Sequence, residues 1–164
     1  MRSVCLLATW RALSNRRRFA PTGKDDGLVQ VHTHDGKRLL SLVGHTGHVS
    51  DVAFNQDGSW LVSASNDSTA RVWDVATGSM VHVHRFASEV ISIALSSNGL
   101  LAVALYHVDE IRVLWLAADV PAAKLMAVDR PVRVRFAPEH AARGQLLYFS
   151  QHVGTAYPMS VIKM

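Results

Sequence analysis

The sequence predicts an all-β protein, made of about four similar sheet modules within one domain segment, residues 1–164. Short segments rich in β-branched and aromatic residues alternate with turn-forming residues, a pattern typical of antiparallel strands. One set of residue types recurs every 41 positions, and such repetition indicates a repeat architecture. The 164 residues are 49% hydrophobic and 18% charged, as in a folded domain, and the apolar runs are too short to span a bilayer.

The clearest module occupies residues 42–84. It contains four short β-rich segments, at residues 49–54, 60–65, 70–73 and 80–84. The residues between these segments favour turns, namely Asn55-Gln56-Asp57-Gly58, Asn66-Asp67-Ser68 and Ala76-Thr77-Gly78. Four antiparallel strands in so short a stretch form one small sheet.

The same module recurs on both sides when the chain is shifted by 41 residues. The end of the first strand falls on Leu13, Phe54, Leu95 and Phe136, and a third-strand position falls on Val31, Val72 and Val113. Residues 138–144 make a longer turn in the fourth copy, so its later strands, at 145–150 and 157–164, are expected out of register. The expected repeat units are residues 4–43, 44–84, 85–128 and 129–164.

Residues Gly44-His45, Asp67 and Trp73-Asp74 carry a resemblance to a known family. The segment 42–84 resembles a WD repeat, which has Gly-His near its start, an Asp before the third strand and Trp-Asp at that strand's end. The other three units match this pattern in degenerate form, least of all in residues 129–164. The resemblance implies a partial, incomplete WD-type β-propeller of about four four-stranded antiparallel blades.

The resemblance also implies a buried hydrogen-bond network of His45, Ser63, Asp67 and Trp73. An indole N–H needs an acceptor, a hydroxyl can accept and donate onward, and a histidine can pass the bonding to a carboxylate. Hydrolases also use a Ser-His-Asp set, but Ser63 falls within a predicted strand and lacks the glycine-flanked turn of a nucleophile. We therefore expect no catalytic residue and no enzymatic activity.

The other modules keep less of this network. In the first, Thr22, Asp26 and His32 occupy matching positions, and Val4 replaces the histidine. In the third, the polar members are replaced by Ala104, Val108 and Leu114. Replacing a whole polar set by apolar residues costs less than removing one partner, so the third module can still pack.

In the resembled family, partners contact the loops that join one blade's outer strand to the next blade's inner strand. Carried over by position, the candidate partner-binding residues are Thr46, His48, Asn66, Glu89 and His107. The alternative interpretation of each is an ordinary solvated loop residue. The set contains no large aromatic or arginine anchor, so it does not indicate which partner binds.

Few residues suggest a ligand. His32 and His34, and also His82 and His84, share a strand face two residues apart, but no acidic or thiol ligand accompanies them. Histidines on a strand surface are the favoured interpretation. Arg130, Arg133 and Arg135 suggest either a solvated strand face or contact with a central channel or an anion. Phosphate-binding loops and paired cysteines are absent from the sequence, so we expect no metal, no cofactor and no small-molecule substrate.

The net charge of +4 is unevenly distributed. Residues 1–24 hold six basic residues and no acid, whereas the remainder carries eleven basic and thirteen acidic residues. An arginine-rich, acid-free start resembles a mitochondrial presequence. The repeat register reaches into it at Leu13 and Phe19, which favours strand structure. With Cys5 as its single cysteine, the chain is expected in an intracellular compartment, cytoplasmic or nuclear.

Two function classes are compatible with this sequence. The first is a non-catalytic scaffold that binds other proteins, with no membrane association. The second is a subunit of an RNA–protein complex in ribosome biogenesis, because residues 96–115 are similar to a repeat of WD-repeat subunits of the small-subunit processome. The basic residues 1–24 favour RNA contact electrostatically, and residues 25–164 do not.

The repeat count leaves three arrangements open. A closed propeller has four to eight blades, and this sequence holds about four units. It is expected to be a fragment of a longer propeller; alternatively it completes a ring with another chain or closes as a strained four-bladed ring. An open array exposes strand edges, so self-association is expected for the isolated chain.

Overall fold

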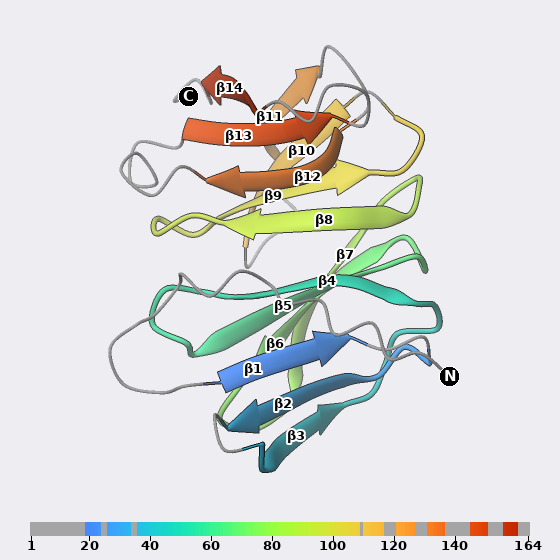
Figure 1. The fold of residues 1–164 in the computed structure, drawn as a ribbon, viewed down its shortest axis with the longest axis vertical. Coiled ribbons are helices and arrows are strands. Elements are labelled where there is room, and N and C mark those ends of the chain that lie inside the picture. Colours follow the sequence, from blue (N-terminus) through green and yellow to red (C-terminus); the bar gives the residue numbers. More distant parts are fainter. Residues whose placement is uncertain are drawn as a thin grey trace.

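A computed structural model describes residues 19–23, 26–33, 36–108, 110–116, 121–126, 131–136, 145–150 and 156–160. The regular elements in these ranges are all β-strands, which confirms the all-β prediction. The strands form separate antiparallel sheets stacked along the long axis of the molecule (Figure 1). The described residues contain no helix, and so no apolar helix that could cross a membrane.

Each sheet is built from strands that follow one another in the chain. The first sheet contains β1 (Phe19–Gly23), β2 (Val29–Thr33) and β3 (Arg38–Leu42). The second contains β4 (Val49–Phe54), β5 (Trp60–Ser65), β6 (Thr69–Asp74) and β7 (Met80–Arg85). This order is a meander, in which every strand pairs with its sequence neighbour.

The second half of the chain repeats this arrangement. The third sheet contains β8 (Val90–Leu95), β9 (Leu100–Leu105), β10 (Glu110–Trp115) and β11 (Pro121–Met126). The fourth contains β12 (Pro131–Phe136), β13 (Gln145–Ser150) and β14 (Ala156–Ser160). The second and third sheets thus have the predicted four strands, and the first and last have three within the described residues.

The 41-residue repeat is visible in the strand bounds. Strands β4, β8 and β12 begin at residues 49, 90 and 131, and β6 and β10 begin at residues 69 and 110. The predicted slip in the fourth module is also present, because β13 begins at Gln145, three residues beyond the position set by β5. The strand expected at 157–164 is β14, Ala156–Ser160, and residues 161–164 lie outside the described ranges.

The sheets pack through the strands that open each module. β4 contacts β8, and β8 contacts β12, and these strands lie one above another in Figure 1. β1 contacts β4, although by the repeat register β1 is the second strand of its module. The strand expected around Leu13 lies outside the described residues.

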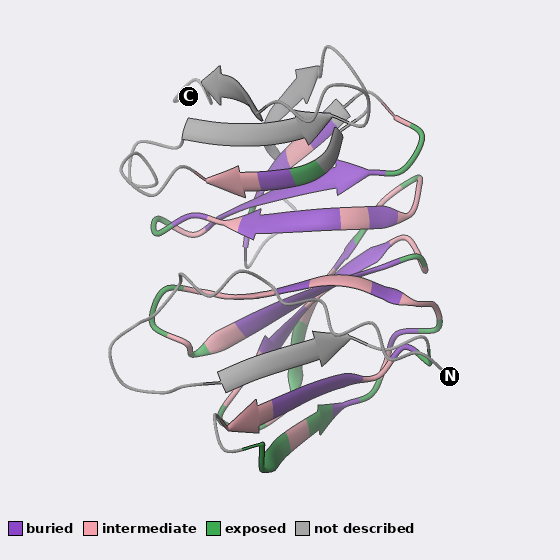
Figure 2. Cartoon of the chain, viewed as in Figure 1, coloured by how far each residue is buried: buried purple, intermediate pink, exposed green. Residues whose placement is uncertain are grey.

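Three apolar clusters fill the spaces between successive sheets. The cluster between the second and third sheets includes Val62, Val72, Leu101 and Val103. Two further clusters join the first sheet to the second and the third to the fourth. Every residue of β9 is buried, because both faces of this strand are covered (Figure 2). The outer strands are more open, with three of five residues exposed in β3 and three of six in β7. The stacked sheets therefore share interiors that no single sheet could form.

Equivalent turns close the first hairpin of the second and third sheets. The Gly58 amide donates to the Asn55 carbonyl at 3.1 Å, and the Gly99 amide donates to the Ser96 carbonyl at 3.3 Å. Both glycines have positive φ angles, 75° and 85°, which only glycine adopts without steric cost. The spacing of these two turns is again 41 residues.

Candidate functional site

His45, Ser63, Asp67 and Trp73 lie together within the second sheet. His45 is in the loop between β3 and β4, and Asp67 is in the turn between β5 and β6. His45 Nδ1 lies 2.8 Å from Asp67 Oδ2, and His45 Nε2 lies 2.7 Å from Ser63 Oγ. The Trp73 indole donates to Ser63 Oγ at 2.8 Å. The structure thus links the four side chains into one continuous chain of hydrogen bonds.

The chemistry of the end groups sets the direction of these bonds. The indole can only donate and the Asp67 carboxylate can only accept. His45 Nδ1–H therefore donates to Asp67, and the Ser63 hydroxyl donates to the bare Nε2 while accepting from Trp73. This arrangement requires a neutral His45 ring. Burial lowers the pKa of His45, an effect that outweighs the opposing influence of Asp67.

Asp67 is the acceptor for several groups. Thr46 N, Thr69 N and the Thr69 hydroxyl donate to it at 3.1, 3.0 and 2.5 Å. Burial raises the pKa of Asp67, but the hydrogen bonds from Thr69, His45 and Thr46 outweigh it and bring the pKa down to about 2. An ionised Asp67 therefore ties the β3–β4 loop to the β5–β6 turn.

The backbone around His45 is closely packed. A Cβ atom on Gly27 would lie 2.4 Å from the His45 carbonyl oxygen, and Gly27 has a positive φ of 76°. A Cβ atom on Gly44 would lie 2.8 Å from Arg71 Nη1. Gly27 therefore cannot carry a side chain where the first sheet meets the His45 backbone, whereas Gly44 faces the flexible end of the Arg71 side chain.

The Ser-His-Asp geometry does not expose a nucleophile. Ser63 has no exposed surface and lies within β5. Its hydroxyl oxygen already accepts from Trp73, and its proton is directed at His45. A substrate carbonyl would need access to this oxygen, so the arrangement fits a structural network.

The folded state is expected to lose stability on acidification in two steps. The pKa of His45 is lowered in the folded chain, so the unfolded chain takes up its proton first, and stability falls as the pH drops below the ordinary histidine value of 6.5. Asp67 stabilises the folded chain fully above the ordinary aspartate pKa of 3.8, and this contribution is lost as the pH falls toward 2. Denaturant melts at pH 8, 5 and 2.5 measure both steps. In Asp67→Asn the loss of stability between pH 5 and 2.5 should be smaller than in the unmodified chain; an equal loss would contradict the assignment.

The other modules keep less of this network. In the first, Asp26 Oδ1 accepts from Leu28 N at 3.1 Å, just as Asp67 Oδ1 accepts from Thr69 N. His32 is half-buried, while Val4 and the Thr22 side chain lie outside the described part of the chain. In the third, Leu114 is buried and Val108 packs beside the apolar cluster. The prediction of Ala104 at the Ser63 position is wrong by one residue, because Val103 pairs with Ile93 as Ser63 pairs with Val52.

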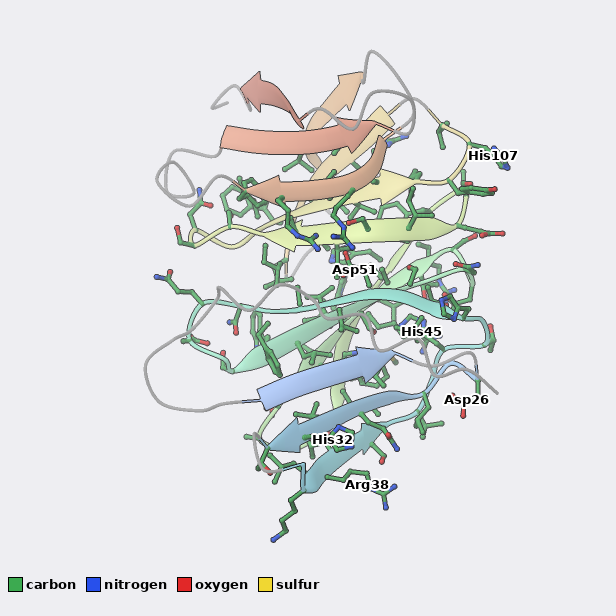
Figure 3. All side chains as sticks on the ribbon, viewed as in Figure 1. Asp26, His32, Arg38, His45, Asp51 and His107 are labelled. Atoms are coloured by element: carbon green, nitrogen blue, oxygen red, sulfur yellow. The ribbon has the colours of Figure 1, made fainter. Side chains whose placement is uncertain are left out.

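The candidate partner-binding residues lie on one edge of the stacked sheets. Thr46, Asn66 and His107 are exposed, whereas His48 and Glu89 are half-buried. Asn66 N donates to the His48 carbonyl at 2.9 Å, and Tyr106 N donates to the Glu89 carbonyl at 2.8 Å. Figure 3 places His45 and His107 toward the same side of the molecule. The binding role of these residues stays a prediction.

Sequence reasoning missed an exposed aromatic residue on this edge. Tyr106 is 44% exposed, and its ring lies against that of His107 with centroids 3.7 Å apart. Tyr106 closes an apolar run, Leu100 to Tyr106, and hydrophobicity alone places such a residue in the core. No turn is predicted after this run, so the sequence pattern gives no signal that Tyr106 is exposed.

A polar bridge between sheets was also missed. Asp51 on β4 accepts from the Ser92 hydroxyl at 2.8 Å, from Ile93 N at 3.1 Å and from Arg135 Nη1 at 3.4 Å. Ser92 lies on β8 and Arg135 on β12, so one carboxylate joins three successive sheets (Figure 3). Of the three arginines considered for an anion, Arg135 pairs with Asp51, Arg133 is exposed and Arg130 lies outside the described residues.

Asp51→Ala is expected to lower the free energy of unfolding by about 1–3 kcal/mol, because it leaves the buried Ile93 amide without this acceptor. Asp51→Asn keeps an acceptor oxygen and should cost less. Chemical denaturation compares the two variants with the unmodified chain. Equal stability of Asp51→Ala and the unmodified chain would show that the bridge contributes nothing to sheet packing.

The histidine pairs need a correction. His84 is only 1% exposed, and its Nε2 lies 3.1 Å from the Leu116 carbonyl, so the prediction of a strand-surface histidine is wrong there. Leu116 lies directly after β10, the third strand of the next sheet. His82 contacts His84 edge-on, with centroids 4.5 Å apart. Among the described residues, no three His, Cys, Asp or Glu side chains cluster as metal ligands; His34 lies outside them.

Comparison with known proteins matches this geometry. The family model described as "WD domain, G-beta repeat" matches residues 36–74, which include the Gly-His, Asp and Trp-Asp positions. Human WD repeat-containing protein 36 is 36% identical over 93 residues, covering 56% of this chain and 10% of the relative. Zebrafish (Danio rerio) WD repeat and SOCS box-containing protein 1 is 48% identical over 67 residues, covering 39% and 16%.

Two further similarities concern proteins of assemblies. The target of rapamycin complex subunit LST8 of Saccharomyces cerevisiae is 32% identical over 71 residues, covering 43% of this chain and 23% of the relative. A chain in the crystal structure of the mitotic checkpoint complex superposes with a TM-score of 0.74 at 18% identity, covering 88% of this chain and 45% of that one. This second likeness shows the propeller fold alone. The chain spans less than a quarter of the length of each relative described here.

Proposed function

The chain belongs to the WD-repeat family, and we propose that it acts as a non-catalytic scaffold that binds other proteins through the edge carrying Thr46, Asn66 and His107. The observation that carries this proposal is the backbone pairing of the loops at that edge. The Asn66–His48 and Tyr106–Glu89 bonds hold loop and turn together at equivalent positions of two successive sheets. Side chains on such loops are presented from a rigid base.

The buried network supports the same function. It fixes the β3–β4 loop through His45 and Thr46, and both depend on Asp67. A loop held in one conformation loses less entropy when a partner binds. Among the relatives described above, one is named as a subunit of the target of rapamycin complex, and this supports protein partners for the present chain.

An RNA–protein complex in ribosome biogenesis stays a prediction. The names of the relatives described above do not concern ribosome assembly. The basic segment that favoured RNA contact is residues 1–24, of which only 19–23 are described. A cytoplasmic or nuclear location stays a prediction as well, and protein binding is the function that the described residues support best.

Quantitative cross-linking and affinity capture test the scaffold proposal. The edge variant combines Asn66→Arg with Ala87→Arg, and Ala87 lies in the loop between β7 and β8 at the same edge. The control combines Gln56→Arg in the β4–β5 turn with Ala76→Arg in the β6–β7 turn, at the opposite edge. All four side chains are exposed. Proteins cross-linked to the unmodified chain should fall about fivefold with the edge variant and persist with the control. Equal recovery with both variants would contradict the proposal. Recovery that depends on intact RNA would favour the ribosome-biogenesis alternative.

A further inference from the structure

We propose that Tyr106, His107 and Glu89 form a binding site for a lysine or arginine side chain in a basic segment of a partner protein. This inference rests on the proposed scaffold function and names the chemistry that one part of its edge recognises. The site lies where β8 begins and β9 ends, at the edge that carries the other candidate residues.

The aromatic component of the site is exposed and ordered by its own contacts. Tyr106 exposes 44% of its surface, although it directly follows the fully buried strand β9. The His107 ring lies against the Tyr106 ring at 3.7 Å between centroids, tilted by 47°. The Ser88 hydroxyl donates to the Tyr106 carbonyl at 2.6 Å, which fixes the backbone beneath the rings. The face of a tyrosine ring attracts lysine and arginine cations.

The carboxylate component lies directly across from the aromatic one. Val90 pairs with Leu105, and the bond from Tyr106 N to the Glu89 carbonyl continues this pairing by one residue. Residues opposite each other in an antiparallel pair share a face, with Cβ atoms about 4.5–5.5 Å apart. Glu89 therefore stands beside Tyr106, and a cation held on the ring is within reach of the carboxylate.

The charges of the hairpin favour a cationic occupant over an anionic one. Residues 86–108 contain no lysine or arginine, and Glu89 is the single acid among them. The nearest cation along the chain is Arg85, the exposed last residue of β7 in the preceding sheet. A half-buried carboxylate beside an exposed aromatic ring is a poor site for phosphate or an acidic peptide.

The backbone at His107 is left-handed, with a φ of 60°. Ser68 in the β5–β6 turn of the preceding sheet has a φ of 64°, so a left-handed residue is a feature of this turn in both sheets. The left-handed turn directs the histidine outward, as Figure 3 shows, at the point where Tyr106 is exposed.

A peptide titration followed by NMR tests the inference. The probe is a capped peptide with two lysines and two arginines separated by glycine and serine, and its counterpart carries glutamate at those four positions. The basic peptide should shift the backbone amide signals of residues 86–89 and 105–108, and the acidic peptide should not. Tyr106→Ala should weaken binding about fivefold and Glu89→Gln about threefold, whereas Tyr106→Phe should retain it.

Trp115→Ala is the matched control, because Trp115 is an equally exposed aromatic residue, at 45%, at the opposite end of the third sheet. It should leave binding unchanged, and Arg85→Gln should leave it unchanged or strengthen it. Any of three results would overturn the inference. The two peptides bind with equal affinity, the basic peptide does not bind at millimolar concentration, or neither Tyr106→Ala nor Glu89→Gln alters its affinity. If this inference fails but the edge variant still captures fewer partner proteins than the control, the proposed scaffold function remains supported.

Discussion

Asp67→Ala is expected to lower the free energy of unfolding by about 2–4 kcal/mol, the largest effect that we expect for a polar side chain among the described residues, because it breaks a buried, charged hydrogen-bond network. The carboxylate accepts from His45 Nδ1–H, Thr46 N, Thr69 N and the Thr69 hydroxyl, and an alanine replaces none of these bonds. The His45 N–H then keeps only the Thr69 hydroxyl, 3.3 Å from Nδ1, as a neighbouring acceptor in a buried position. Urea unfolding followed by tryptophan fluorescence measures the change.

Asp57→Ala is the matched control. Asp57 accepts from Ser59 N in the β4–β5 turn and is exposed, so its loss should change stability by less than about 1 kcal/mol. A midpoint for Asp67→Ala equal to that of Asp57→Ala would mean that the network does not hold the sheet together. If the NMR amide signals of His45 and Thr46 disappear while the unfolding midpoint is unchanged, the destabilisation is confined to that loop.

Leu101→Ala is expected to destabilise the chain by about 2–5 kcal/mol, since it opens a cavity in a packed interior. Leu101 has no exposed surface and belongs to the cluster that the second and third sheets share, with Val62 and Val72 on the facing sheet. The loss therefore acts on two sheets at once. Leu39→Ala provides the comparison, because Leu39 on the outer strand β3 is 43% exposed.

Because Leu39 is exposed, Leu39→Ala should change the free energy of unfolding by no more than about 0.5–1 kcal/mol, although it removes the same atoms as Leu101→Ala. Calorimetry of both variants under identical conditions separates burial from residue type. Equal melting temperatures for Leu101→Ala and Leu39→Ala would mean that the cluster between the sheets adds no stability. A melt that splits into two transitions in Leu101→Ala would show that the sheets unfold separately once their interface is weakened.

The strand pattern could be predicted because it depends on local sequence. Alternating β-rich and turn-forming residues predict the strands Val49–Phe54, Trp60–Ser65 and Gln145–Ser150. The longer turn before Gln145 explains why that strand is shifted in register. The residues of the buried network could be named because the WD-repeat pattern fixes their positions within one module. Their hydrogen bonds arise inside a single module, over at most 22 residues of sequence.

The contacts between sheets were beyond the reach of the sequence pattern. Asp51 and Arg135 are 84 residues apart and meet only because their strands stack. His84 is buried for the same reason, since its ring meets the carbonyl of Leu116, 32 residues away. The exposure of Tyr106 depends on where β9 ends relative to its neighbours. Hydrophobic periodicity predicts the strands within a module, but it does not predict which residues of different modules come into contact.

Side-chain NOEs between methyl groups of the second and third sheets would probe the shared interior most directly. In a sample labelled at Ile, Leu and Val methyl groups, Val62 and Val72 should show NOEs to Leu101 and Val103. Spectra in which each sheet shows only contacts within itself, with none joining these two pairs, would contradict the stacking on which the fold, the edge and its proposed sites depend.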